Sequence, residues 1–109
     1  MVNKVILVGN VGDAPVVKTV GESKVANLSL ATTETYKNKD GERVSSTEWH
    51  RLVLWRGLAD IAEKYIQKGS PIYVEGKIEY KSYDKDGVKH YYTEIKVSEL
   101  KLMPKKSEG

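Results

Sequence analysis

Two indoles and a guanidinium share one parity in a strand-like segment: Trp49, Arg51 and Trp55. Alternate side chains of a β-strand point to opposite faces, so these three lie on one face and Leu52 and Leu54 on the other. Leucines are typical of a protein core, and we therefore expect the indoles and the arginine outside it. The alternative is the reverse parity, but a small interior has little room for two indoles beside an arginine.

A later segment, residues 71–83, repeats this pattern. Its apolar residues have one parity, and Gly76 among them suits a bend or a close approach of two strands. The opposite parity carries aromatic and basic side chains with two glutamates: Tyr73, Glu75, Lys77, Glu79, Lys81 and Tyr83. A solvated face on which tyrosine and lysine alternate by chance is the alternative.

Rings that alternate with cations on a strand face suit the binding of single-stranded nucleic acid. An unpaired base stacks on an aromatic ring, which contributes about 1–3 kcal/mol per base whatever the sequence. Lysines and arginines neutralise the phosphates between the bases, so the affinity depends on salt. Duplex DNA hides the faces of its bases. The pattern therefore predicts a face that binds single strands without sequence preference.

The residues that a metal site, a nucleotide-binding loop or an enzyme would need are absent or do not have the required spacing. The sequence has no cysteine, and His50 and His90 stand 40 residues apart without partners at metal-binding spacing. Gly9 and Gly12 complete neither a P-loop nor a dinucleotide-binding fingerprint. We expect no enzyme activity, no metal site and no cofactor.

Composition is typical of one globular domain. The 109 residues are 39% hydrophobic and 30% charged, and the net charge of +3 weakly favours an anionic partner. The longest apolar run, residues 5–8, is far shorter than the roughly 20 residues of a transmembrane helix, and no signal peptide is recognisable. We expect a cytoplasmic protein without a membrane partner.

Most of the chain alternates with period two, which is typical of β-strands. We expect five strands, at about 2–8 with a continuation at 16–20, then at 24–36, 45–55, 71–83 and 89–102. A polar loop at 37–42 follows the second strand. Residues 84–87, Asp-Lys-Asp-Gly, are a hairpin-turn signal between the last two.

One segment has helical spacing instead, with an apolar stripe of Leu58, Ile61, Ala62, Tyr65 and Ile66. Gly69 fits the stop beyond its C-terminus. Five strands with a single helix between the third and fourth is the order of an OB-fold, a five-stranded Greek-key barrel, so we expect an all-β protein. An open five-stranded sheet with one helix is the alternative. A change of apolar parity in the last strand predicts a β-bulge near Ser98 and Glu99.

The first strand is apolar on both faces. Val5 and Leu7 have one parity, and Ile6 and Val8 have the other. One face fills the barrel, and a second subunit is the simplest cover for the other. Burial under the chain's own loops is the alternative.

Several segments occur in the order of a known family: residues 3–12 (NKVILVGNVG), 25–32 (VANLSLAT), 47–51 (TEWHR), 68–70 (KGS), 73–76 (YVEG) and 92–94 (YTE). Through them the chain resembles the bacterial single-stranded DNA-binding protein (SSB) family over about residues 1–102. The resemblance implies an OB barrel, a homotetramer that wraps single-stranded DNA, and a nucleoid-associated role in replication, recombination and repair.

The resemblance also implies functional residues. Base stacking falls on Tyr36, Trp49, Trp55 and Tyr83, although the family commonly has Trp, Trp, Phe and Trp there. Phosphate contacts fall on Lys4, Lys37, Lys39, Arg51, Lys68 and Lys81.

Two further cations complete the predicted binding residues. Arg56 precedes Gly57 where the family usually has Gly-Lys, and Lys77 lies on the aromatic and basic parity of its strand. Glu79 stands where the family commonly has a basic residue, and Ser82 also lacks the charge that is usual at its position. His50 and Tyr73 match subunit-interface positions, which adds them to residues 5–8 (Val5, Ile6, Leu7 and Val8).

We expect residues 1–103 to form the OB domain and residues 104–109 a short disordered end. Family members continue with a linker and an acidic, Phe-tipped peptide that recruits replication and repair proteins. This sequence ends at Gly109 without one, as a short natural variant or a truncated core, so such recruitment is not predicted for it. Other readings are a dimeric OB-fold primosome component that mainly binds partner proteins, or an OB module for oligosaccharides.

Overall fold

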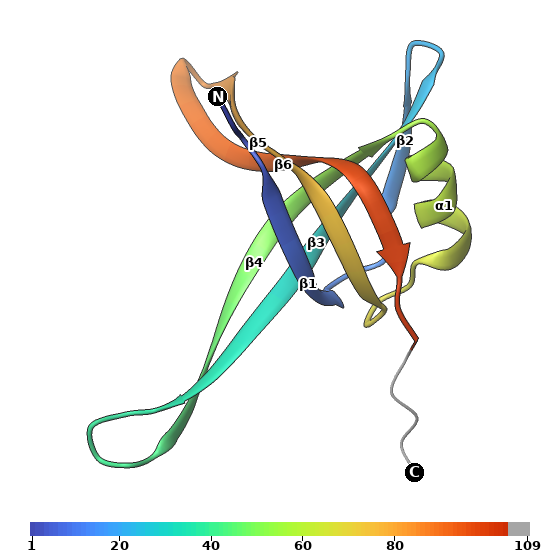
Figure 1. The fold of residues 1–109 in the computed structure, drawn as a ribbon. Helices are drawn as coiled ribbons and strands as arrows, with labels where there is room; N and C mark the ends of the chain where they lie inside the picture. The colour runs from blue at the N-terminus through green and yellow to red at the C-terminus, as the bar shows by residue number, and fades with distance from the viewer. Residues whose placement is uncertain (105–109) are drawn as a thin grey trace.

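Six strands and one helix make up the computed structural model, which describes residues 1–104 (Figure 1). In chain order they are β1 (Val5–Val11), β2 (Val16–Val20), β3 (Ser23–Lys37), β4 (Arg43–Trp55), α1 (Gly57–Tyr65), β5 (Pro71–Lys85) and β6 (Val88–Leu102). The end predicted to be disordered, 104–109, lies outside the described residues except for Pro104. Within residues 1–104, no helix is long and apolar enough to cross a membrane.

The strands close into a barrel. The pairing runs β1–β5–β6–β4–β3 and returns to β1 through Asn10 opposite Ala31 and Val11 opposite Leu30. All pairs are antiparallel except β4 with β6. β2 continues along β3 beyond β1, so β1 and β2 are the two parts of the predicted first strand. The helix therefore lies between the third and fourth predicted strands, and the OB-fold prediction is confirmed.

The core confirms the predicted strand parity. The largest fully buried side chains include Leu52 and Leu54 on β4, and Ile72 and Val74 on β5. Trp49 on β4 is 64% exposed. The alternative with both indoles in the core is therefore wrong.

The β5–β6 pair depends on a close contact between backbones at Gly76. A Cβ at Gly76 would collide with the carbonyl oxygen of Lys96, as the predicted close approach requires. Next to it, Glu75 lies opposite Glu99 and Gly76 opposite Val97. The residue between them on β6, Ser98, has no opposite partner. This is the predicted bulge, and it bends the strand.

The predicted apolar stripe of the helix was only partly correct. Ala59 and Ala62 are the buried residues of α1, whereas Ile61 and Tyr65 are exposed. The cause is that α1 packs on β3 and β4 along a small-residue face. The helix also ends at Tyr65, so Gly69 lies in the following loop and does not cap it.

Two hairpins extend beyond the barrel (Figure 1). The β3–β4 hairpin ends in the loop 38–42, and the β5–β6 hairpin ends in a two-residue turn. Asp86 and Gly87 form that turn with φ values of 51° and 77°, which is typical of a type I′ turn and confirms the predicted hairpin.

Candidate nucleic-acid interface

A groove of about 640 Å³ lies beside Trp49 on the outside of the barrel. Because side chains alternate along β4, Trp49 and Arg51 project from the face opposite the buried leucines. β2, β3 and β6 supply the other walls. The lining residues are Asp13, Ala14, Val16, Lys18, Asn27, Leu28, Ser29, Trp49, His50, Arg51, Tyr92 and Glu94.

Stacked side chains connect this groove to the β5–β6 hairpin. The guanidinium carbon of Arg51 lies 4.8 Å from the ring centroid of Tyr92. That ring lies 6.0 Å from Tyr83, which stacks on His90 at 5.1 Å with 15° between the ring planes. The predicted Arg51 and Tyr83 thus belong to one row of rings and a cation, and the predicted Trp49 lies at its end, where it lines the same groove as Arg51.

Sequence reasoning missed Tyr92 and His90 in this row. The signal lay in the hairpin register, because a two-residue turn at Asp86 and Gly87 places His90 opposite Tyr83. Two residues further on, Tyr92 lies opposite Lys81 and on the same face.

Trp55 and Arg56 lie at the end of β4, outside the groove lining. Trp55 is 36% exposed. The backbone of Arg56 has φ 56° and ψ −118°, a region that favours glycine. Its N–H donates to the Lys24 carbonyl at 2.7 Å and its Nε to Ser23 Oγ at 3.4 Å. Strained backbone of this kind is often found at functional positions.

Of the remaining predicted cations, Lys81 lies beside the row, opposite Tyr92, and the others lie elsewhere. The Nζ of Lys81 lies 3.9 Å from Glu79 Oε1. Lys77 is exposed and lies opposite Lys96. Lys68 lies in the loop that bonds to Val11, where Gly69 N donates to the Val11 carbonyl at 2.7 Å.

Tyr36 lies away from the groove. It pairs with Val44 on the protruding β3–β4 hairpin, and alternation places it on the face opposite Trp49. Lys37 ends β3, and Lys39 is exposed in the loop beyond it. The structure therefore does not bring these three residues together with Trp49.

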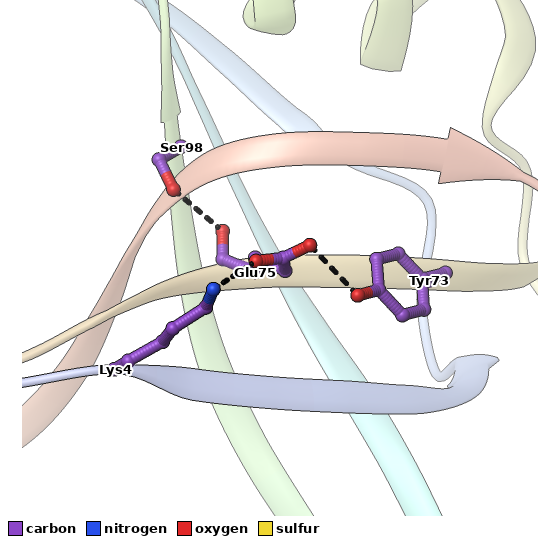
Figure 2. A network of polar contacts seen from close by, with 4 residues as sticks. All are labelled: Lys4, Tyr73, Glu75 and Ser98. Atoms are coloured by element: carbon purple, nitrogen blue, oxygen red, sulfur yellow. Dashed lines mark hydrogen bonds and ion pairs between the residues drawn. The ribbon is translucent and has the colours of Figure 1, made fainter.

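Lys4 belongs to a polar network on another face, shown in Figure 2. Its Nζ lies 2.8 Å from Glu75 Oε1, and the Tyr73 hydroxyl donates to Glu75 Oε2 at 2.7 Å. The Ser98 hydroxyl donates to the Glu75 carbonyl at 3.2 Å. Hydrogen bonds from Lys4 and Tyr73 lower the pKa of Glu75 to about 2, and the carboxylate raises the pKa of Lys4.

The structure exposes only some of the residues that were predicted to form the subunit interface. Ile6 and Val8 are 55% and 52% exposed, so the chain's own described loops do not cover them. Val5 and Leu7 pack against the core of their own chain. Tyr73 lies opposite Val8.

His50 is separate from that surface. It lines the groove, where its Nε2 lies 2.8 Å from the Thr32 hydroxyl. The structure therefore does not bring His50 together with the exposed residues of β1.

Comparisons with known proteins cover nearly the whole chain. The profile of the single-strand binding protein family matches residues 2–103. A single-stranded DNA-binding protein of Xanthomonas axonopodis pv. citri is 44% identical over 99% of this chain and 61% of its own length. One from Rickettsia typhi is 50% identical over 85% of this chain and 64% of its own length. The chain thus spans about three-fifths of these relatives.

Solved structures agree in fold. The Plasmodium falciparum SSB complex with ssDNA is 34% identical, with a TM-score of 0.87 over 95% of this chain and 96% of that one. A deletion mutant of the single-stranded DNA binding protein from Thermus aquaticus is 26% identical, with a TM-score of 0.80 over 94% of this chain and 51% of that one.

Proposed function

Since the chain belongs to the single-strand binding protein family, we propose that it binds single-stranded DNA without sequence preference in replication, recombination and repair. The observation that carries the proposal is the row on the outside of the barrel, in which Trp49, Arg51 and Tyr83 are exposed and Tyr92 is half-buried between Arg51 and Tyr83. A place in the cytoplasm with the nucleoid is part of the same proposal.

The row provides the two interactions that an unpaired strand needs. Trp49 offers an exposed indole on which a base stacks. Arg51 lies over Tyr92, which holds the guanidinium in place by a cation–π interaction and leaves its edge to donate to a phosphate. Within residues 1–104, Arg51 makes no ion pair that would neutralise it. Trp55 and Arg56 extend the path towards α1.

Fluorescence titration tests this proposal. We expect oligo-dT to quench the tryptophan emission, with log K falling by about 0.7 for each phosphate neutralised as log salt rises. Duplex DNA of the same length is the control and should bind more weakly. Equal affinity for the duplex, or a flat salt dependence, would contradict the proposal.

We further propose a homotetramer that is assembled through the outer face of β1. Ile6 and Val8 supply exposed apolar area, and Tyr73, Glu75 and Lys4 form a fixed polar network next to it. Apolar area beside satisfied polar groups is typical of subunit interfaces.

Sedimentation measures the assembly. Ile6→Glu should lower the mass, because it places a charge in the interface. Val20→Glu is the matched control, since Val20 is 54% exposed on β2. An unchanged mass for Ile6→Glu would reject this interface. A wild-type dimer with weak affinity for oligo-dT would instead favour the primosome-like reading.

A further inference from the structure

The indole of Trp49 lies against the backbone of Gly12, in the break between β1 and β2. A Cβ built on Gly12 would collide with Cζ3 of Trp49 and lie 3.2 Å from Cη2 of the same ring. It would also lie 2.8 Å from the hydroxyl of Ser29. The N–H of Gly12 donates to the Ser29 carbonyl at 2.9 Å, which fixes this backbone against β3.

We propose that Gly12 is a positioning residue for DNA binding, because its missing side chain forms the seat for the six-membered ring of Trp49. The proposal rests on the stacking function argued above. A seated ring is held before the strand arrives, and less conformational freedom is then lost on binding.

The need for glycine at this position comes from the ring and not from the backbone. Gly12 is absent from the glycines with positive φ in residues 1–104, so an alanine could adopt its backbone conformation. Gly9 and Gly76 differ, because a Cβ there would collide with the carbonyls of Ala31 and Lys96. At Gly12 the blocking atoms belong to side chains. An added methyl group therefore displaces the indole and leaves the barrel closed.

The displaced ring would no longer align with its neighbours. Trp49 and Arg51 line the same groove, and Arg51 is held over Tyr92. A base that stacks on a shifted indole would direct its phosphate away from the guanidinium. Gly12 thus affects affinity without touching the DNA itself.

The experiment uses Gly12→Ala in a Trp55→Phe background, where Trp49 is the only source of indole emission. We expect the Trp49 emission maximum to shift and oligo-dT affinity to fall by between about two- and tenfold. Gly57→Ala is the matched control, because a Cβ at Gly57 meets nothing within 4 Å and its φ is not positive. It should change neither quantity.

A double-mutant cycle with Trp49→Leu separates the two proposals. If Gly12 acts through the indole, Gly12→Ala should have no further effect on affinity once Trp49 is removed. Unchanged emission and affinity in Gly12→Ala would overturn the proposal, as would a loss that persists in the Trp49→Leu background. If Gly12→Ala unfolds, Trp49→Leu must restore the melting temperature, and failure to do so also overturns it. Full affinity in Trp49→Leu alone would reject stacking on Trp49, while the emission shift still reports on the seat.

Discussion

Two outer faces of the barrel differ in whether their charged side chains are paired within the chain. On the β1–β5 face, Lys4 and Tyr73 both bond to Glu75, at 2.8 and 2.7 Å (Figure 2). On the β4–β6 face, Arg51 lies over the ring of Tyr92 and makes no ion pair within residues 1–104. The first face satisfies its charges within the chain, and the second leaves a cation open.

This difference distinguishes two cations to which the sequence alone assigns the same role. Lys4 and Arg51 were both predicted to contact phosphate, yet Lys4 already neutralises a carboxylate. A phosphate that binds Lys4 must compete with Glu75, whose charge remains at neutral pH because its pKa is about 2. We therefore expect DNA affinity to depend on the β4–β6 face and assembly and acid sensitivity to depend on the β1–β5 face.

The largest expected effect follows from Trp49→Ala. Removal of the exposed indole should weaken oligo-dT binding by about 1–3 kcal/mol, because one base loses its stacking partner. Binding is measured with an oligonucleotide of about eight nucleotides, which suits a single OB barrel. Tyr65→Ala is the control, since Tyr65 is 63% exposed on α1 and lies outside the groove. Equal losses for both variants would show that exposure alone, and not position, decides stacking.

Arg51→Ala should have the next largest effect. We expect an affinity loss of about 1 kcal/mol and a salt slope smaller by about 0.7, because one phosphate contact disappears. Lys4→Ala is compared over the same salt series and should leave the slope unchanged. A slope that falls by the same amount in both variants would remove the distinction between the two faces.

Period-two alternation made much of the fold predictable. Trp49 and Leu52 fall on opposite faces whatever the topology, because alternation is a local property of any strand. The bulge at Ser98 was visible as a change of apolar parity. In the helix, apolar spacing was only partly successful, because Ala62 of the predicted stripe is buried while Ile61 faces solvent and Ala59 takes a buried place outside the stripe. Apolar spacing does not reveal how closely a helix approaches its barrel.

The parts of the site that were not predicted depend on register and on backbone conformation. The positions of Tyr92 and His90 follow from which residues β5 and β6 place opposite one another. The conformation of Arg56 leaves no trace in a one-dimensional pattern. Tyr36 was assigned by resemblance, and only the pairing of β3 with β4 shows that it lies on the opposite face from Trp49.

Arg56→Gly should change stability and binding in opposite directions. Glycine adopts the observed φ of 56° without strain, so we expect the free energy of unfolding to rise by about 1 kcal/mol. Oligo-dT affinity should fall by a few-fold at low salt, because a cation beside Trp55 is lost. Denaturant unfolding and binding are measured on the same samples. A variant that is both less stable and fully active would mean that Arg56 is neither strained nor part of the binding face.

The smallest effect on DNA binding is expected from Glu75→Gln, which acts on the other face. Oligo-dT affinity should stay within about twofold of the wild type, since Glu75 lies outside the groove. Stability should respond instead. The folded pKa of about 2 lies below the ordinary 4.5, so the ionised carboxylate stabilises the protein above pH 4.5 and loses this effect as the pH falls towards 2.

The melting temperature of Glu75→Gln should therefore lie below that of the wild type at neutral pH, and the gap should narrow as the pH falls towards 2, where about half of the Glu75 carboxylates are protonated. Glu22→Gln is the control, because Glu22 is exposed and makes no ion pair within the described part of the chain. A gap between wild type and Glu75→Gln that stays constant from pH 7 to pH 2 would mean that the network does not depend on the charge of Glu75. The contrast between the two faces would then lie in their shapes and not in how their charges are paired.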